Sequence, residues 1–246
     1  MSAHEFFTHV TAAVVWGLPL PYGVVAGRRL EVAVTWPCRA PESQGITAHA
    51  LRPTLAHRCV HPGTGFWVCT PATTWALLGA VLTRVEDLVA VGDAIVRVPM
   101  HAKDPPALGT IDQLRAAMEA GRRVGINRLR EALPLVIERS RSRPETWLRL
   151  ILRDAGLPAP EANFDVIEHG VWLGQVDLAY PELRIAIEYE GEYHLTDPAQ
   201  WAADIARMDR LVEAGWRVLR VTKEGVFTHP MHTVERVRRA IAVATR

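Results

Sequence analysis

Cysteine is scarce in this chain of 246 residues. Cys38, Cys59 and Cys69 are odd in number, lie far apart and form no Cys-x-x-Cys pair. Disulfide frameworks and thiolate zinc sites need closely patterned cysteines, so the sequence predicts neither. This cysteine usage fits a reducing cytoplasm.

Long apolar runs are also missing, although 49% of the residues are hydrophobic. No window reaches the roughly 18 consecutive apolar residues that a membrane-spanning helix needs. Residues 1–16 lack the basic flank and apolar run of a signal peptide. The sequence therefore predicts a cytoplasmic globular protein without a membrane partner, long enough for one large or two small domains.

A strong charge of one sign is absent, since the formal net charge is +1. The arginines are nevertheless unevenly distributed. They crowd one region: Arg122, Arg123, Arg128, Arg130, Arg139, Arg141, Arg143, Arg149 and Arg153. A local excess of arginine suits phosphate binding. The alternative is that these arginines form the solvated faces of helices.

The first hundred residues are predicted to mix helices and strands. Thr70-Pro71 has the capping residue and first-turn proline of a helix start. His49, His57 and His61 lie on loop-rich strands and are interpreted as a chance grouping rather than a metal site. The expected helices cover residues 8–16, 72–82 and 85–96, and the expected strands cover 30–35, 46–51 and 65–69.

The second half has a clearer element order. The polar loop 101–109 is interpreted as a boundary, and arginine-rich helices follow it. Pro144 then opens a helix with apolar residues at helical spacing. Strands are expected at 164–169, 173–180, 184–189 and 216–222, and helices at 198–214 and 229–242. The order is α, β, β, β, α, β, α.

Polar and apolar residues alternate in the two strands that flank Pro181-Glu182. Strand side chains alternate between faces, which places Val176 and Leu178 opposite Asp177. In the second strand, Ile185, Ile187 and Tyr189 are expected opposite Ala186, Glu188 and Glu190. A hairpin then brings Asp177 beside Ala186 or, after a small register change, beside Glu188, within roughly 5–8 Å.

Asp177, Glu188 and Glu190 are therefore expected to converge. Gathered carboxylates repel one another and bind protons more tightly unless a cation compensates. Hard oxygen donors favour Mg²⁺ or Mn²⁺ over zinc. The hairpin thus predicts a metal site, and the alternative is a solvent face that happens to be acidic.

With the acids in these places, the element order resembles the PD-(D/E)XK nuclease superfamily. Asp177 matches its metal-binding aspartate, Glu188-Tyr189-Glu190 matches its E-x-K tripeptide, and Glu145 matches the acid of the preceding helix. Glu190 stands where the family has lysine. The resemblance implies an α/β fold with a restriction-endonuclease-like αβββαβα core at residues 142–246.

More narrowly, residues 142–222 resemble a bacterial domain family of unknown function related to very-short-patch-repair endonucleases. The resemblance covers about a third of the chain. Its matching words are Ser142-Arg143-Pro144-Glu145-Thr146, Gly156-Leu157-Pro158, Val176-Asp177-Leu178-Ala179-Tyr180-Pro181, Glu188-Tyr189-Glu190-Gly191-Glu192-Tyr193-His194 and Gly215-Trp216-Arg217-Val218-Leu219-Arg220-Val221-Thr222.

The resemblance also implies roles for individual residues. Asp177, Glu188 and the backbone carbonyl of Tyr189 are expected to hold Mg²⁺ or Mn²⁺, and Glu145 to reach a second ion or a metal-bound water. Glu190, in the place of lysine, can bind metal or accept a proton. His194 is a candidate proton shuttle, or alternatively a loop residue or helix cap.

Nucleic-acid contacts are expected from Arg143, Arg149 and Arg207. Arg207 has the alternative of pairing with Asp204 along its helix. Lys223 is a further candidate to replace the missing lysine. Trp147, Trp201 and Trp216 are interpreted as core rather than as base-stacking groups.

The first half resembles the central region of actinobacterial proteins related to AbiEi-type abortive-infection antitoxins. The matching words are Thr8-His9-Val10-Thr11-Ala12-Ala13, Trp16-Gly17-Leu18-Pro19-Leu20-Pro21 and Val91-Gly92-Asp93-Ala94. Such proteins usually begin with a winged-helix module, and none is recognised here. The expected organisation is a smaller mixed α/β domain at 1–100, an arginine-rich helical linker at 101–141 and the nuclease-like domain at 142–246.

Two functions follow as hypotheses. The first is a metal-dependent DNA endonuclease acting in defence, repair or mobile-element biology. The second is a catalytically inactive DNA-binding or antitoxin-like regulator that keeps the nuclease fold. DNA is the expected partner in both. A homodimer and a toxin partner are open alternatives.

Overall fold

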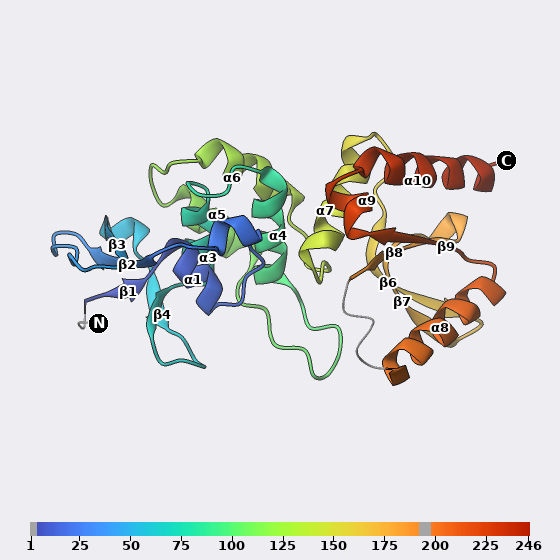
Figure 1. The fold of residues 1–246 in the computed structure, drawn as a ribbon, viewed down its shortest axis with the longest axis horizontal. Helices are drawn as coiled ribbons and strands as arrows, with labels where there is room; N and C mark the ends of the chain where they lie inside the picture. Colours follow the sequence, from blue (N-terminus) through green and yellow to red (C-terminus); the bar gives the residue numbers. More distant parts are fainter. Residues whose placement is uncertain (1–3, 192–197) are drawn as a thin grey trace. The chain divides into compact units, whose positions relative to one another are not determined.

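The computed structural model describes residues 4–191 and 198–246, except for the side chains of residues 198–203. The chain forms two compact units, Met1–Glu138 and Arg139–Arg246, each with its own sheet (Figure 1). Both sheets are mixed and both units contain helices, which confirms the predicted α/β class. No described helix is long and apolar enough to cross a membrane.

The first unit is built on a five-stranded sheet of order β3-β2-β1-β5-β4. Its strands are β1 (Phe6–Phe7), β2 (Leu30–Thr35), β3 (Ile46–Leu51), β4 (Arg58–Val60) and β5 (Trp67–Cys69). Its helices are α1 (His9–Val15), α2 (Tyr22–Val25), α3 (Pro71–Leu78), α4 (Val85–Val96), α5 (Ile111–Glu119) and α6 (Ile126–Ala132). The predicted cap of α3 is present, since Thr70 Oγ1 accepts a bond from Thr73 N at 3.4 Å.

The expected linker at 101–141 differs from what the structure contains. Helices α5 and α6 pack against α3 and α4, and their Leu114 and Leu129 side chains are fully buried. Ile137 N then donates to Asp93 Oδ1 of α4 at 2.7 Å. The division between the units therefore follows Glu138, not residue 100, and the first unit is the longer of the two. The apolar faces of α5 and α6 need a neighbour to cover them, which a linker does not provide.

The second unit has a four-stranded sheet of order β6-β7-β8-β9, in which β8 and β9 are parallel and the other pairs antiparallel. Its strands are β6 (Glu161–Glu168), β7 (Val171–Tyr180), β8 (Ile185–Glu190) and β9 (Arg217–Thr222). Its helices are α7 (Arg143–Asp154), α8 (Pro198–Glu213), α9 (Lys223–Phe227) and α10 (Pro230–Ala244). Helix α9 was not anticipated, and the restriction-endonuclease-like core remains a prediction.

Helices cover both faces of this second sheet (Figure 1). Ile185 and Ile187 of β8 join the core formed with α7, α9 and α10, whereas Ala186 joins Leu211 of α8 on the other face. The predicted alternation of β8 is therefore confirmed. Trp147 and Trp216 lie in these cores, as predicted, and the side chain of Trp201 lies outside the described part.

The predicted alternation of β7 is wrong at one point. Val176 packs with Ala179 in the core beneath α8, whereas Leu178 packs in the opposite core. The neighbouring strand explains the change of face. Asn163 lies between the pairs Phe164–Val176 and Ala162–Leu178 and has a left-handed backbone with φ of 48°. Such a residue interrupts the two-residue period, so the strand faces change beside Asp177.

Candidate active site

The β7–β8 hairpin places Asp177 and Glu188 side by side. Leu178 pairs with Ile187, so Asp177 and Glu188 are the next residues along this register. The backbone amide of Tyr189 donates to Asp177 Oδ2 at 2.7 Å. Of the two registers considered from the sequence, the structure has the one that brings the acids together.

Glu145 reaches the same region from the first turn of α7. The helix starts at a Ser142 cap, whose Oγ accepts a bond from Glu145 N at 3.3 Å. Glu145 is buried, and its Oε2 accepts bonds from Arg141 N at 3.0 Å and from Asn163 Nδ2 at 2.8 Å. These two donors fix the Glu145 carboxylate beside β6, the strand that pairs with β7 and therefore with the segment around Asp177.

The charged forms of Asp177 and Glu188 are both disfavoured at this site. Burial raises the pKa of Asp177 well above its usual range, and repulsion from Glu145 and Glu188 adds to the effect. Burial also raises the pKa of Glu188, with Glu145 contributing, although Arg207 acts in the opposite direction. A cation in this region therefore has a large favourable interaction available to it.

Arg207 of α8 supplies one such cation. Its Nη1 lies 2.6 Å from Glu188 Oε1 and donates at 2.7 Å to the carbonyl oxygen of Gln175. Its Nε is 3.9 Å from Asp204 Oδ1, so the intrahelical pair considered from the sequence exists but is long. Arg207 therefore holds a buried acid of the cluster, and nucleic-acid binding by this arginine stays a prediction.

The approach of Arg207 to the hairpin depends on Gly174. A Cβ atom at Gly174 would stand 2.8 Å from Arg207 Cγ and 2.9 Å from its Cδ, closer than nonbonded carbons pack. The backbone φ of Gly174 is 155°, which other residues rarely adopt. The glycine thus lets the arginine stem cross the strand.

Gly174→Ala is expected to displace Arg207 and to lower the free energy of unfolding by about 1–3 kcal/mol, measured by urea denaturation. Gly170→Ala is the matched control. Gly170 also has a positive φ, 79°, but nothing lies within 4 Å of a Cβ placed there. Equal losses in the two variants would mean that contact with Arg207 is unimportant.

Glu190 makes a different contact from the one expected. It forms an ion pair with Arg220 of β9, so its carboxylate already has a cationic partner. His194 lies outside the described residues. Lys223 is an exposed residue at the start of α9. The amide of Tyr189 binds Asp177, and metal binding by its carbonyl stays a prediction.

Arg143 stacks on aromatic rings instead of extending from the surface. Its guanidinium carbon lies 5.1 Å from the ring centroid of Trp147 and 4.8 Å from that of Phe227. Arg149 is half-buried on the same helix. Nucleic-acid binding by Arg143 and Arg149 stays a prediction.

Several arginines of the dense region bind backbone carbonyls. Arg123 Nε donates to Ala117 O at 2.9 Å, and Arg128 Nη2 donates to Gly79 O at 2.7 Å. Arg139 Nη2 donates to Asn163 O at 2.9 Å. These residues stabilise the fold locally, a role that neither the phosphate interpretation nor the solvated-face interpretation described.

The carboxylate set fits a hard divalent ion through two of its members. The oxygens of Glu145, Asp177 and Glu188 do not all lie within 4.8 Å of one another. Mg²⁺ retains most of its water ligands and needs one or two protein carboxylates. Asp177 and Glu188, adjacent in the hairpin, meet that requirement.

Three residues that support the site were not found from the sequence. Asn163 holds Glu145, Arg141 Nη1 donates to Gln175 Oε1 at 3.3 Å, and Gln175 O receives Arg207. Asparagine's tolerance of the left-handed conformation is the one available signal, and it is weak at a residue that lies just before the strand expected at 164–169.

Comparison with known proteins finds relatives but no assigned activity. No family model matches the chain, and no solved structure matches it. Uncharacterized protein Rv2248 of Mycobacterium tuberculosis H37Rv and uncharacterized protein MT2308 of M. tuberculosis CDC 1551 are each 31% identical to it over 201 residues. The matches cover 76% of this chain and 74% of each relative. The chain therefore belongs to the same family as these two mycobacterial proteins.

Proposed function

We propose that the Arg139–Arg246 unit is a Mg²⁺- or Mn²⁺-dependent DNA endonuclease. The observation that carries the proposal is the cluster of Glu145, Asp177 and Glu188, in which burial and mutual repulsion raise the pKa values of Asp177 and Glu188. Such an arrangement costs the fold stability, and a bound divalent cation would offset that cost.

Hydrolysis of a phosphodiester joins a water oxygen to phosphorus and breaks the bond from phosphorus to the leaving sugar oxygen. The attacking water loses a proton, and the leaving oxygen gains one. A bound Mg²⁺ would supply a more acidic water and offset the charge that develops on phosphate. Asp177 and Glu188 would hold the ion, and Glu145 would orient or deprotonate the water.

Positive charge at the site comes from Arg207 rather than from the usual lysine position. Glu190 occupies that position and is paired with Arg220. Arg207 is within 2.6 Å of Glu188 and is fixed by the Gln175 carbonyl. It can therefore stabilise negative charge that develops next to Glu188, a role that needs a permanent cation.

The test is incubation of plasmid and linear DNA with the full chain in Mg²⁺, in Mn²⁺ and with a chelator. Cleavage is expected with either ion and not with the chelator. Glu188→Gln is expected to reduce it by about a hundredfold or more, because a neutral amide binds Mg²⁺ poorly. Glu161→Gln, which changes an exposed acid of β6, is the matched control. Equal cleavage by wild type and Glu188→Gln would refute the proposal.

A non-catalytic DNA-binding regulator is the second candidate. The ion pairs Arg207–Glu188 and Arg220–Glu190 favour it, because they compensate two acids of the motif without a metal. A gel-shift measurement on the same samples distinguishes the two functions. Salt-sensitive DNA binding without Mg²⁺ and without cleavage would support the regulator.

A further inference from the structure

A second cluster of metal-ligating side chains lies in the first unit, remote in sequence from the acids described above. His9, Glu31 and His49 each offer a ligand atom, and these atoms lie within 4.8 Å of one another. Among the described residues, this is the group of three or more His, Cys, Asp or Glu side chains whose ligand atoms all lie within 4.8 Å of one another. His49 was grouped with His57 and His61 from the sequence, whereas its neighbours in space are His9 and Glu31.

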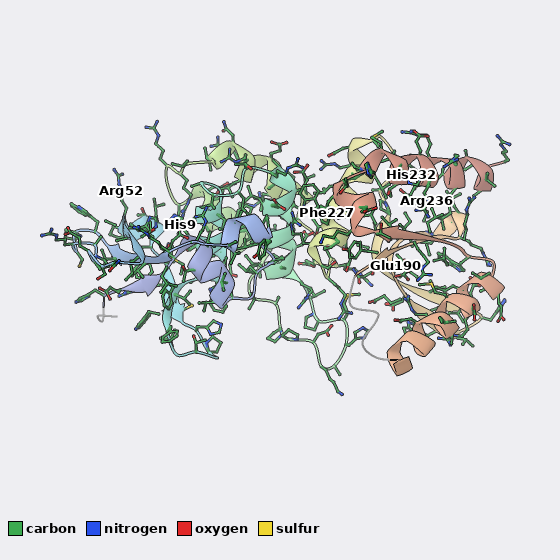
Figure 2. The ribbon with its side chains drawn as sticks, viewed as in Figure 1. His9, Arg52, Glu190, Phe227, His232 and Arg236 are labelled. Atoms are coloured by element: carbon green, nitrogen blue, oxygen red, sulfur yellow. The ribbon has the colours of Figure 1, made fainter. Side chains whose placement is uncertain are left out.

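The fold explains how the three residues meet. Strands β2 and β3 are parallel, with Glu31 opposite Thr47 and Ala33 opposite His49, so Glu31 and His49 share a face. Helix α1 packs on β2, and His9 is its first residue (Figure 2). The His9 and His49 rings stack with centroids 4.2 Å apart. One helix start and two strands thus present their ligands to one point.

One ring nitrogen of this cluster has no hydrogen-bond partner among the described residues. His49 Nε2 is a buried nitrogen with no hydrogen-bond partner among the described residues. It lies 3.7 Å from Glu31 Oε1, beyond hydrogen-bond distance. A buried polar atom left in this way destabilises the fold, and a bound ligand would recover that loss.

The supporting contacts are those of an oriented metal ligand set. Glu31 Oε2 accepts a bond from Val10 N at 2.7 Å, and its Oε1 faces His49. Nδ1 of His9 lies 3.1 Å from Thr8 Oγ1. Partners of this kind fix the orientation of ligating carboxylates and imidazoles.

The protonation states also suit a cation. Burial lowers the pKa of His9 to about 4, so its ring is neutral at pH 7 and has a lone pair to donate. Burial acts to raise the pKa of Glu31, but the His49 ring and the Val10 amide outweigh it and the pKa is lowered. Glu31 is therefore ionised in the same pH range.

Backbone strain adds an independent sign of function. His9 has φ of 45°, a left-handed conformation that few residues other than glycine adopt. Such strain persists where the surrounding structure imposes it, and it concentrates at functional sites. At this position it directs an imidazole toward Glu31 and His49 instead of continuing the preceding strand.

We propose that His9, Glu31 and His49 form a binding site for a divalent transition metal of the zinc class. Two imidazoles and one carboxylate suit Zn²⁺ and its neighbours, whereas Mg²⁺ prefers oxygen ligands throughout. Ligand atoms around tetrahedral Zn²⁺ lie about 3.4 Å apart, so the 3.7 Å between Glu31 and His49 needs little adjustment. Three protein ligands leave a coordination position open.

Two features govern access to the site. The His49 side chain is 25% exposed on the edge strand β3, which gives an ion a route from solvent. Arg28 Nη1 lies 3.7 Å from Glu31 Oε1, and its side chain is 40% exposed. Binding of a cation would displace Arg28 into water. The Arg28–Glu31 ion pair lost in this way is partly exposed and stabilises the fold little.

The test is titration of the full chain with Zn²⁺ against a chromogenic chelator, with the visible spectrum of the Co²⁺-loaded protein as a second measurement. One bound equivalent is expected, and excess Mg²⁺ does not displace it. His49→Gln and Glu31→Gln are expected to weaken binding at least about tenfold and to abolish the Co²⁺ spectrum. Zinc is also expected to raise the melting temperature of the wild type and not of these variants.

Two controls make the outcome decisive. His57→Gln removes an exposed histidine of the same unit and is expected to bind Zn²⁺ as the wild type does. Asp177→Ala removes the nuclease-like site and is expected to do the same, so this proposal stands or falls independently of the proposed function. Circular dichroism verifies that each variant is folded. No binding to the wild type, or unchanged binding in folded His49→Gln, would overturn the proposal.

Discussion

Asp177→Asn is expected to reduce the rate of metal-dependent cleavage by about a hundredfold or more and to increase the free energy of unfolding. The amide can still accept the bond that Tyr189 N makes to Asp177 Oδ2. It removes the charge that burial, Glu145 and Glu188 all disfavour. Cleavage activity and stability thus change in opposite directions, as is common where an active site contains buried charged groups that destabilise the fold.

The pH dependence of stability gives this prediction its sharpest form. The folded-state pKa values of Asp177 and Glu188 are raised, so each acid binds protons more tightly in the folded chain than in the unfolded chain. Their contribution is fully present below the unfolded pKa of about 4 and is lost as the pH rises through the folded value. The wild type is therefore expected to lose stability from these acids as the pH rises above about 4.

Urea unfolding at a series of pH values, without divalent ions, measures this effect. Asp177→Asn is expected to flatten the loss toward neutral pH, and Mg²⁺ to offset part of it in the wild type. Glu161→Gln, at an exposed acid, is the control and is expected to follow the wild type. Retained cleavage, or an Asp177→Asn chain less stable than the wild type at pH 7, would contradict the prediction.

Arg207→Gln is expected to lower the free energy of unfolding by about 2–4 kcal/mol at pH 7 without Mg²⁺. The side chains of Glu188 and Arg207 are 8% and 21% exposed, so removal of the arginine leaves a buried carboxylate without its partner. Arg207→Lys is expected to be intermediate, because lysine keeps the charge but lacks the planar fork that binds Glu188 and the Gln175 carbonyl together.

A double-mutant cycle isolates this interaction. Adding Glu188→Gln to Arg207→Gln is expected to recover most of the lost stability, because no unpaired charge remains. Arg210→Gln is the matched control on the same helix, since Arg210 is exposed and donates to Leu173 O at 3.4 Å. If Arg207→Gln lowers the free energy of unfolding no more than Arg210→Gln does, the 2.6 Å contact between Arg207 and Glu188 does not stabilise the fold.

The sequence predicted best those features that depend on local pattern. The helix from Pro144, the four strands of the second sheet and the alternation of β8 follow from residue periodicity, and the structure has them at nearly the expected bounds. The proximity of Asp177 to Glu188 follows from one hairpin register. Such features involve residues close in sequence, where spacing alone defines the geometry.

The features that were missed depend on contacts between distant residues. Arg207 reaches Glu188 across Gly174, and no spacing rule connects a helix residue to a strand in this way. Helices α5 and α6 were expected to form a linker because the polar loop 101–109 precedes them, whereas their buried leucines decide where they pack. Strands β1 and β4 are too short to show a period.

Asn163 limits which residues could replace it without disturbing Glu145. Its side chain donates to both Arg139 O and Glu145 Oε2, and its left-handed backbone lies where the strand faces change. Glycine would keep the conformation but lose the donor, and aspartate would place a fourth negative charge against Glu145. The position of the Glu145 carboxylate therefore depends on an uncharged neighbour as well as on the acids themselves. Loss of this one amide would disturb the cluster while every acid is still in place.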